Sequence, residues 1–340
     1  MSGQNILDRP RQGQFANFAA DFGTRFLVTV DTEEEFDWTA PISRTGNGVS
    51  AVPKIQDFQN FCRQHAVVPL YLVDHLVATS PEAAEILKPA AKCGQAEIGL
   101  HLHPWVNPPF DEAVSQHNSY AGNLSPELER QKFLHLLQTI ETNLEIRPTI
   151  YRAGRYGTGP NTAALLKDAG FLIDSSVRSS FDYRKDGGPD YRNHPLPPYW
   201  LDKDRSLLEL PVTTVFWGLL RRFGPALYPL SGHVRYLQAL LTRTGLLERI
   251  PLTPEGVNVN EAIRAIDIAI DDALPVLVFS FHSPSLAPGN TPYVRSEADL
   301  KRFYEWWEQI LSHLGKRGIA STTVSEITQS LSLATAPGPS

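Results

Sequence analysis

Residues 26–35 read Phe-Leu-Val-Thr-Val-Asp-Thr-Glu-Glu-Glu, a short apolar run that ends in an acidic cluster. A run of this length and β-branched content is typical of a buried strand. A dinucleotide-binding sheet would need a glycine-rich turn directly after its first strand, whereas acidic residues occupy that place here and cannot cradle a phosphate. The stretch therefore argues against a Rossmann sheet.

Strand-like and helical segments alternate along the rest of the chain. The strand-like runs are 67–73, 96–102, 149–152, 171–174, 275–281 and 318–324, and the helical patterns are 53–65, 81–92, 125–144, 159–169, 259–273 and 297–314. This alternation predicts parallel strands with helices outside them. Polar residues stand at or just past the strand ends, where barrel enzymes place their chemistry: Asp31, His101, Arg152, Asp174 and His282. We therefore predict an α/β fold in which the strands form a barrel.

The rhythm breaks late in the barrel, at about residues 178–256, which are rich in proline, glycine and aromatic residues and contain one strand-like run, 207–213. We interpret this region as a large insertion. With no internal repeat and no linker, the sequence predicts a single domain at 25–326. An N-terminal extension at 1–24 and a disordered tail at 327–340 would flank it.

Composition narrows the function. The 340-residue chain has a formal net charge of −6 and no basic run, which argues against nucleic acid or an anionic membrane as partner. Its two cysteines, Cys62 and Cys93, are too few and too far apart for a disulfide scaffold or a cysteine zinc site. Neither a secretory signal nor an apolar stretch of about 20 residues is present, so we expect no transmembrane segment and a cytoplasmic protein acting on a precursor or fragment.

His101 and His103 are the sharpest local signal. Side chains alternate along a strand, so these two imidazoles point to one side and could hold a divalent metal. Glu33 shares a face with Asp31 on an extended continuation, which offers one carboxylate as ligand and one as general base. The alternatives are a hydrogen-bonded barrel histidine beside a surface histidine, and an acidic run that is merely solvated.

Three further residues at strand ends could complete a site. Arg152 could pair with Asp31 and keep it ionised, although a surface ion pair is equally compatible with the sequence. His282 follows the most apolar strand, where a general acid would be useful, although a lone histidine is more often a core residue. Asp174 could orient His282 or cap a turn. No nucleophile elbow of the Gly-x-Ser-x-Gly type is present.

With these segments in order, the chain resembles the polysaccharide deacetylase superfamily (carbohydrate esterase family 4, NodB-like), and within it the WalW-like branch. The resemblance runs from about Arg25 to Val324. It implies a distorted (β/α)7-type barrel whose metal is held by Asp-His-His. In the first motif, residues 29–32 keep the base as Asp31 but place Thr32 where the family has its metal-binding Asp, and Glu33 is our candidate replacement.

The later motifs are also variant. His101 matches the first histidine of His-(Ser/Thr)-x-x-His, but Trp105 stands in the place of the second, so the resemblance leaves His103 as the other ligand. Residues 152–156 correspond to Arg-x-Pro-Tyr without the proline. Arg152 is thereby implied to hold the base, and the backbone N–H of residue 155 or 156 to face the oxyanion. Asp174 and His282 resemble the aspartate and the histidine acid of the last two motifs.

The resemblance implies a metal-dependent hydrolase of carbohydrate metabolism that removes an acyl group, acetyl in the first place, from an N-acylated sugar or saccharide precursor. One divalent ion is expected, Zn²⁺ first, with Co²⁺, Mn²⁺ or Ni²⁺ as alternatives. Substrate contacts are expected from Trp38, Trp105, Arg155 and Tyr156, with Trp200 as a further stacking candidate. Two other functions stay open: an amidase for a small non-polymer amide, like allantoinase- and deformylase-like relatives, and a non-catalytic carbohydrate-binding protein. The sequence does not decide whether the chain forms a homo-oligomer.

Overall fold

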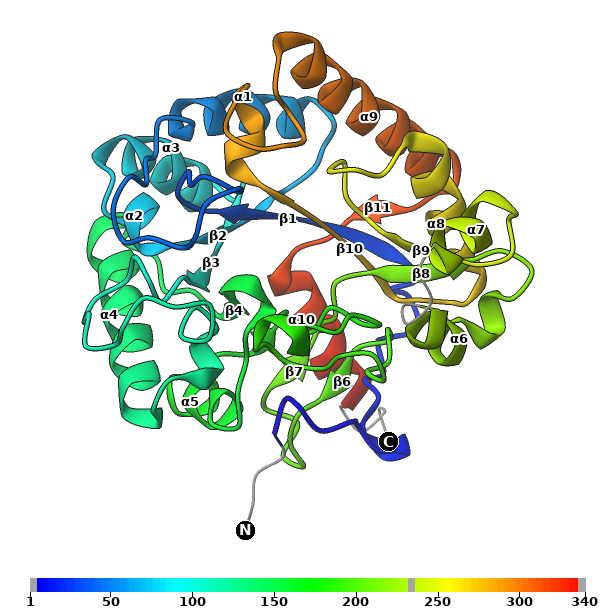
Figure 1. The fold of residues 1–340 in the computed structure, drawn as a ribbon, viewed down its shortest axis with the longest axis horizontal. Coiled ribbons are helices and arrows are strands. Elements are labelled where there is room, and N and C mark those ends of the chain that lie inside the picture. Colours follow the sequence, from blue (N-terminus) through cyan, green and yellow to red (C-terminus); the bar gives the residue numbers. More distant parts are fainter. Residues whose placement is uncertain (1–4, 232–235, 336–340) are drawn as a thin grey trace.

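The computed structural model describes residues 5–231 and 236–335, and its centre is a curled sheet of nine strands (Figure 1). The strand order is β10-β1-β2-β3-β4-β5-β7-β6, with β11 beside β1. All pairs are parallel except β6 with β7. The strands are β1 (Arg25–Thr32), β2 (Leu70–Val73), β3 (Glu97–Leu102), β4 (Ile150–Ala153), β5 (Ile173–Asp174), β6 (Tyr199–Trp200), β7 (Leu208–Glu209), β10 (Val276–His282) and β11 (Ala320–Ser321).

Helices lie around the outside of this sheet (Figure 1). They are α1 (Val52–Gln64), α2 (His75–Ala78), α3 (Pro81–Lys92), α4 (Pro126–Leu144), α5 (Thr162–Asp168), α8 (Val259–Asp271) and α9 (Glu297–Lys316). Ser125 caps α4 by accepting a hydrogen bond from the Leu128 N–H, as the Ser-Pro pair predicts. None of the described helices is long and apolar enough to cross a membrane.

Single residues, and not a continuous ladder, connect β10 to the segment that follows β7. The Thr213 N–H donates to the Val278 carbonyl at 3.2 Å, and the Val278 N–H donates to the Thr213 hydroxyl at 2.8 Å. Leu252 extends this bridge, because its N–H donates to Thr213 O and its carbonyl accepts from Ser280 N–H, both at 3.1 Å. The predicted α/β fold with a distorted barrel is thereby confirmed.

The region 178–256, predicted as an insertion, contributes to the sheet and also projects from it. Of the expected strand 207–213, only β7 forms, because Pro211 has no N–H with which to continue the ladder. Beyond it, β8 (Thr214–Trp217) and β9 (Glu248–Pro251) form an antiparallel pair, and α6 (Gly224–Ser231) and α7 (Leu237–Arg243) lie between them in the chain. The domain boundaries themselves stay a prediction.

The predicted disordered tail is wrong for residues 327–335, which belong to helix α10 (Val324–Thr335). Ile327 and Leu331, one helical turn apart, are 0% and 4% exposed and pack in a cluster with Leu27 and Leu70 of the barrel strands. The many serine and threonine residues around them hide this apolar stripe in the sequence. The rest of the predicted tail, 336–340, lies outside the described residues.

Docking of α10 predicts a specific loss of stability. Replacing Ile327 by alanine removes buried apolar contacts, so the free energy of unfolding should fall by about 2–5 kcal/mol. Urea denaturation measures the change, and Gln329→Ala on the exposed face of the same helix should change it by less than about 0.5 kcal/mol. Equal effects of the two substitutions would contradict the packing of this helix.

Candidate functional site

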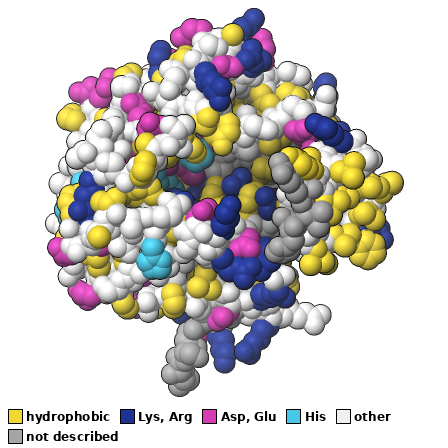
Figure 2. Space-filling view, in the orientation of Figure 1, with side chains coloured by type: hydrophobic (Ala, Val, Ile, Leu, Met, Phe, Trp, Pro, Cys, Tyr) yellow, Lys and Arg dark blue, Asp and Glu magenta, His cyan; other side chains and the backbone are white. Residues whose placement is uncertain are grey.

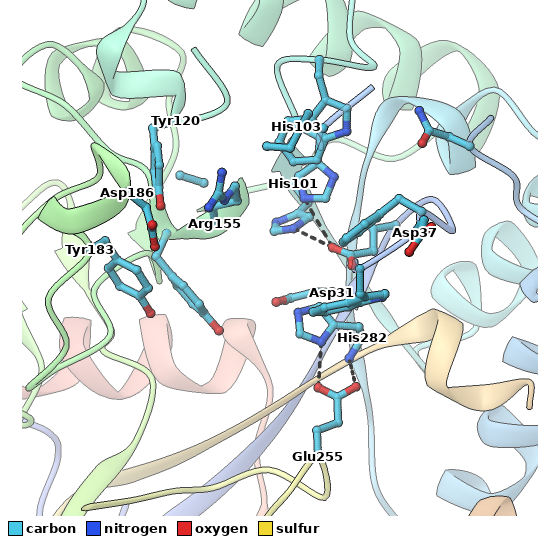
Figure 3. A pocket seen from close by; sticks show the side chains of 18 of the residues that line it. Asp31, Asp37, His101, His103, Tyr120, Arg155, Tyr183, Asp186, Glu255 and His282 are labelled. Carbon is cyan, nitrogen blue, oxygen red and sulfur yellow. Dashed lines mark hydrogen bonds and ion pairs between the residues drawn. The ribbon is translucent and has the colours of Figure 1, made fainter. Parts of the chain in front are cut away.

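A cavity of about 660 Å³ opens at the carboxyl ends of the barrel strands. It is the hollow in the face shown in Figure 2, and Figure 3 gives a close view of its lining. Parallel register brings residues far apart in the chain together here, since Asp31 of β1 pairs with His282 of β10 and His101 of β3 pairs with Arg152 of β4. All four were predicted from their positions at strand ends.

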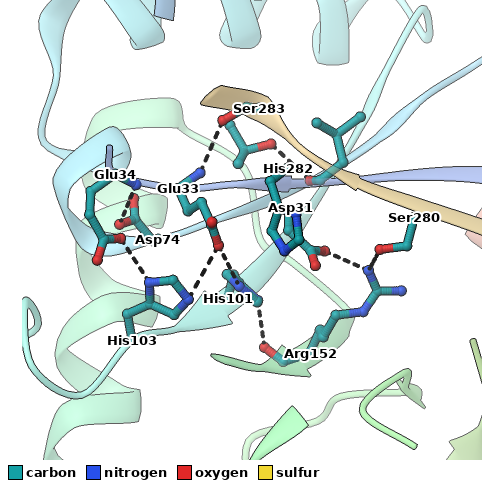
Figure 4. A network of polar contacts seen from close by, with 12 residues as sticks. Asp31, Glu33, Glu34, Asp74, His101, His103, Arg152, Ser280, His282 and Ser283 are labelled. Atoms are coloured by element: carbon teal, nitrogen blue, oxygen red, sulfur yellow. Dashed lines mark hydrogen bonds and ion pairs between the residues drawn. The ribbon is translucent and has the colours of Figure 1, made fainter. Parts of the chain in front are cut away.

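Glu33, His101 and His103 form a buried cluster beside Asp31 (Figure 4). One carboxylate oxygen, Glu33 Oε2, lies 3.4 Å from His101 Nε2 and 3.3 Å from His103 Nε2. His101 Nδ1 lies 3.0 Å from the Arg152 carbonyl, which can only accept, so Nδ1 carries the proton of this ring. His103 Nδ1 lies 2.7 Å from Glu34 Oε2 and is fixed as a donor in the same way. Both Nε2 atoms therefore direct lone pairs at Glu33.

The protonation states of His101, His103 and Glu33 also bear on whether this cluster could bind a metal. Burial lowers the pKa of His101 to about 3, with His103 adding to the effect, and burial lowers the pKa of His103 to about 4. Both rings are thus neutral near pH 7. Burial raises the pKa of Glu33 well above its usual value, and the nearby Glu34 and Asp31 raise it further. Two imidazole lone pairs converge on a buried carboxyl group whose ionised form a cation between them would stabilise, so this donor set fits a divalent metal such as zinc.

A second layer of buried groups orients His103 (Figure 4). Glu34 accepts hydrogen bonds from His103 Nδ1 and from the Trp105 indole N–H, both at 2.7 Å, and the Glu34 N–H donates to Asp74 at 3.2 Å. Carboxylates that hold the outer nitrogen of a histidine ligand are typical of metal sites. Trp105, expected as a substrate contact, lines the cavity but is only 5% exposed and stacks on His103 with centroids 4.2 Å apart. The described contacts of Trp105 therefore help to hold His103 and Glu34 in position.

Asp31 and Arg152 form a buried ion pair at the base of the cavity, in which the Arg152 Nη1 donates to Asp31 Oδ1. Arg152 also donates to Thr29 and Ser280 hydroxyls at 2.9 and 3.1 Å, so its guanidinium is held in one position. Burial raises the pKa of Asp31, but the charge of Arg152, helped by that of His282, outweighs burial and lowers it overall. Asp31 is therefore ionised near neutral pH, as a general base must be.

His282 carries the opposite charge. Its Nδ1 lies 2.7 Å from Glu255 Oε2, and its backbone N–H donates to Glu255 Oε1 at 3.1 Å. Burial alone would lower the pKa of His282, but the charges of Glu255 and Glu33 outweigh it and raise the pKa to about 10. The imidazole is thus protonated near neutral pH, and Figure 3 shows it beside Glu255, away from His101 and His103.

The predicted contact between Asp174 and His282 is wrong. Asp174 is buried and accepts a hydrogen bond from the Ser176 hydroxyl, and burial raises its pKa to about 6. Glu255 occupies the supporting position instead. It lies in the turn-like stretch 253–256, Thr-Pro-Glu-Gly, inside the region without a strand-helix rhythm. A carboxylate in such a stretch does not differ in sequence from a solvated turn residue.

Of the other expected contacts, Trp38, Arg155 and Tyr156 line the cavity. Trp38 meets the His282 ring edge-on at 5.2 Å, and Arg155 and Tyr156 follow β4 with left-handed φ of 55° and 60°. Trp200 does not belong to this group, because it lines a smaller hollow with Leu172 and Leu331. Trp200 lies on β6, the last strand in the sheet order, which pairs antiparallel with β7. This position accounts for its separate location.

No protein-family model and no curated protein matches the sequence. Among solved structures, 4-alpha-glucanotransferase from Thermococcus litoralis is similar with a TM-score of 0.51 and 12% identity, over 90% of this chain and 40% of that one. This likeness concerns the fold alone. A Mycobacterium smegmatis protein assigned as a polysaccharide deacetylase matches with a TM-score of 0.45, 19% identity and coverage of 91% and 96%. A carbohydrate esterase family 4 pseudoenzyme from Bacillus anthracis matches with 0.41, 8%, and coverage of 90% and 65%.

The contact between Glu255 and His282 predicts a measurable pKa change. In metal-free protein, Glu255→Gln removes the negative charge that stabilises the imidazolium, so the pKa of His282 should fall from about 10 toward its usual value. NMR titration of the His282 ring measures this pKa directly. Glu308→Gln, on the exposed face of α9, should leave the value unchanged. An unaltered pKa in Glu255→Gln would contradict the pairing.

Proposed function

We propose that this protein is a metal-dependent hydrolase that removes an acyl group, acetyl in the first place, from an N-acylated sugar. The observation that carries the proposal is the juxtaposition of an ionised carboxylate, Asp31, a metal-type donor cluster and a protonated imidazole, His282, in one cavity. Base, ligand cluster and acid are the three parts that metal-assisted amide hydrolysis requires.

Glu33, His101 and His103 would hold the metal. When bound there, a divalent ion such as Zn²⁺ would polarise the acyl carbonyl and lower the pKa of water. Asp31 would accept the proton of the attacking water, and its low pKa keeps it ready to do so. Arg152 fixes both the charge and the position of Asp31, because the same guanidinium is tied to β1 and β10.

His282 would donate a proton to the nitrogen of the departing amine. An amine leaves poorly as an anion, so this proton transfer is as important as the attack. Glu255 holds Nδ1 of the ring, which leaves Nε2 as the proton donor on the other side. After the transfer the ring is neutral, and the nearby Glu255 and Glu33 charges favour its return to the protonated form.

The cavity limits the substrate. A volume of about 660 Å³ lies within the range of small-molecule sites and suits one or two sugar units. Trp38 and Tyr156 offer aromatic faces to a sugar ring. The motif resemblance to polysaccharide deacetylases favours an N-acetylated sugar within this size range.

A second candidate is an amidase for a small non-polymer amide, and the limited volume of the cavity favours it as well. Release of acetate from N-acetylated mono- and disaccharides and of ammonia or urea from ureides separates the two functions. Zinc uptake without any turnover would instead favour a non-catalytic, carbohydrate-binding role.

Activity should depend on His282 far more than on a histidine outside the cavity. In zinc-loaded protein, His282→Ala should lower kcat for acetate release by about 100-fold or more, since it removes the proton donor. His313→Ala is the matched control, because His313 lies on α9 and pairs with Asp267 outside the cavity. Loss of less than about threefold in His282→Ala would contradict the role of this residue.

A further inference from the structure

The wall of the cavity that Arg155, Arg178 and Tyr183 line carries arginines that lack a carboxylate partner among the described residues. Arg155 and Arg178 line the cavity, and Arg249 packs against the ring of Phe181, which Arg178 also contacts. Within the described residues, none of the three forms an ion pair with an aspartate or glutamate. Asp186 lines the same wall (Figure 3) but is not among their ion-pair partners. Figure 2 shows basic side chains gathered around the hollow.

Arg178 is the least satisfied of these arginines. Its guanidinium carbon lies 3.9 Å from the centre of the Phe181 ring and 5.4 Å from that of Tyr156. Its Nη1 reaches the Tyr183 hydroxyl only at 3.5 Å, and its Nε is buried without a hydrogen-bond partner in the part of the chain that the structure describes. The N–H donors of the Arg178 guanidinium therefore have few hydrogen-bond partners among the described residues.

The two neighbouring arginines add to the positive charge and do not relieve it. Arg249 lies 3.5 Å from the centre of the same Phe181 ring and donates to the Ser180 carbonyl at 2.7 Å. Burial lowers the pKa of Arg249, and the charge of Arg178 lowers it further. Arg155 packs 4.4 Å over the Tyr120 ring and donates to the Ser119 hydroxyl at 2.6 Å. These contacts hold the guanidinium groups in place without neutralising them.

A cluster of partly buried guanidinium groups without counter-charge is costly, and the cost is recovered when a ligand supplies the charge. The guanidinium fork matches the two oxygens of a carboxylate or phosphate. We propose that the substrate bears a carboxylate or phosphate on its sugar, and that Arg178, with Arg155 beside it, binds this group while the acyl group lies at the His101 cluster. This inference rests on the proposed function and narrows its substrate to an anionic N-acylated sugar.

Tyr156 connects the two ends of such a substrate. Its ring contacts Arg178 and stacks on Tyr183 with centroids 5.8 Å apart, and it lies in the short turn that follows β4, the strand that holds Arg152. A sugar ring lying on Tyr156 would extend one substituent toward Asp31 and another toward Arg178. Both an N-acylated uronic acid and an N-acylated sugar phosphate have this shape, with charge and amide on different carbons of one ring.

Calorimetric titration tests the proposal with three probes: N-acetylglucosamine, N-acetylglucosamine 1-phosphate and N-acetylglucosaminuronate. At least one anionic probe should bind wild-type protein about 10- to 100-fold more tightly than the neutral sugar, as expected for hydrogen bonds to a charged group. The stronger of the two anions identifies phosphate or carboxylate as the group recognised. Arg178→Gln should abolish the preference, Arg178→Lys should retain part of it, and Arg130→Gln on the exposed face of α4 should leave it intact.

Equal binding of all three probes, or a preference unaffected by Arg178→Gln, would overturn the proposal. If Arg178→Gln does not fold, as judged by circular dichroism, Arg155→Gln takes its place with the same expected loss. Acetate release is measured separately on the same probes. Binding of an anion without acetate release would refute the proposed function and leave the anion site standing, whereas hydrolysis without charge preference would refute only the anion site.

Discussion

Arg152 is the residue on which the arrangement of the site depends. Its guanidinium, fully buried, is bonded to Asp31 and Thr29 of β1 and to Ser280 of β10, while its own carbonyl fixes the proton of His101 on β3. One side chain and one carbonyl on β4 therefore position both Asp31, the proposed base, and His101, a proposed metal ligand. A buried charge tolerates little displacement because each lost partner leaves it unpaired, so the surrounding strand ends are held in register with it.

Positively and negatively charged side chains are paired with one another around Arg152 and across the cavity. Arg152 keeps Asp31 ionised, Glu255 keeps His282 protonated, and burial keeps the two cluster histidines neutral. Asp31, the two cluster histidines and His282, the proposed base, metal ligands and acid, thus differ in protonation state although they share one small cavity. Pairs of titratable groups whose surroundings push their pKa values apart are typical of sites for acid-base chemistry.

The periodic segments of the sequence predicted which residues meet at the cavity, and the irregular segments did not. Polar residues at the ends of parallel strands must meet at one edge, which brought Asp31, His101 and Arg152 together as expected. Glu255 was missed because it lies on an irregular segment whose path depends on tertiary contacts such as Thr213 with β10. Helix α10 was missed because, among its described residues, only the apolar Val324, Ile327 and Leu331 mark its buried face on a largely polar background.

X-ray absorption at the zinc edge, on protein loaded with one equivalent of zinc, tests the central claim most directly. We expect one tightly held ion per chain, with two imidazole nitrogens at about 2.0–2.1 Å and carboxylate oxygen at about 2.0–2.2 Å, and no retention in the His101→Ala/His103→Ala double variant. Zinc that is not retained by the wild type, or that the double variant holds equally well, would show that Glu33, His101 and His103 are not a metal site.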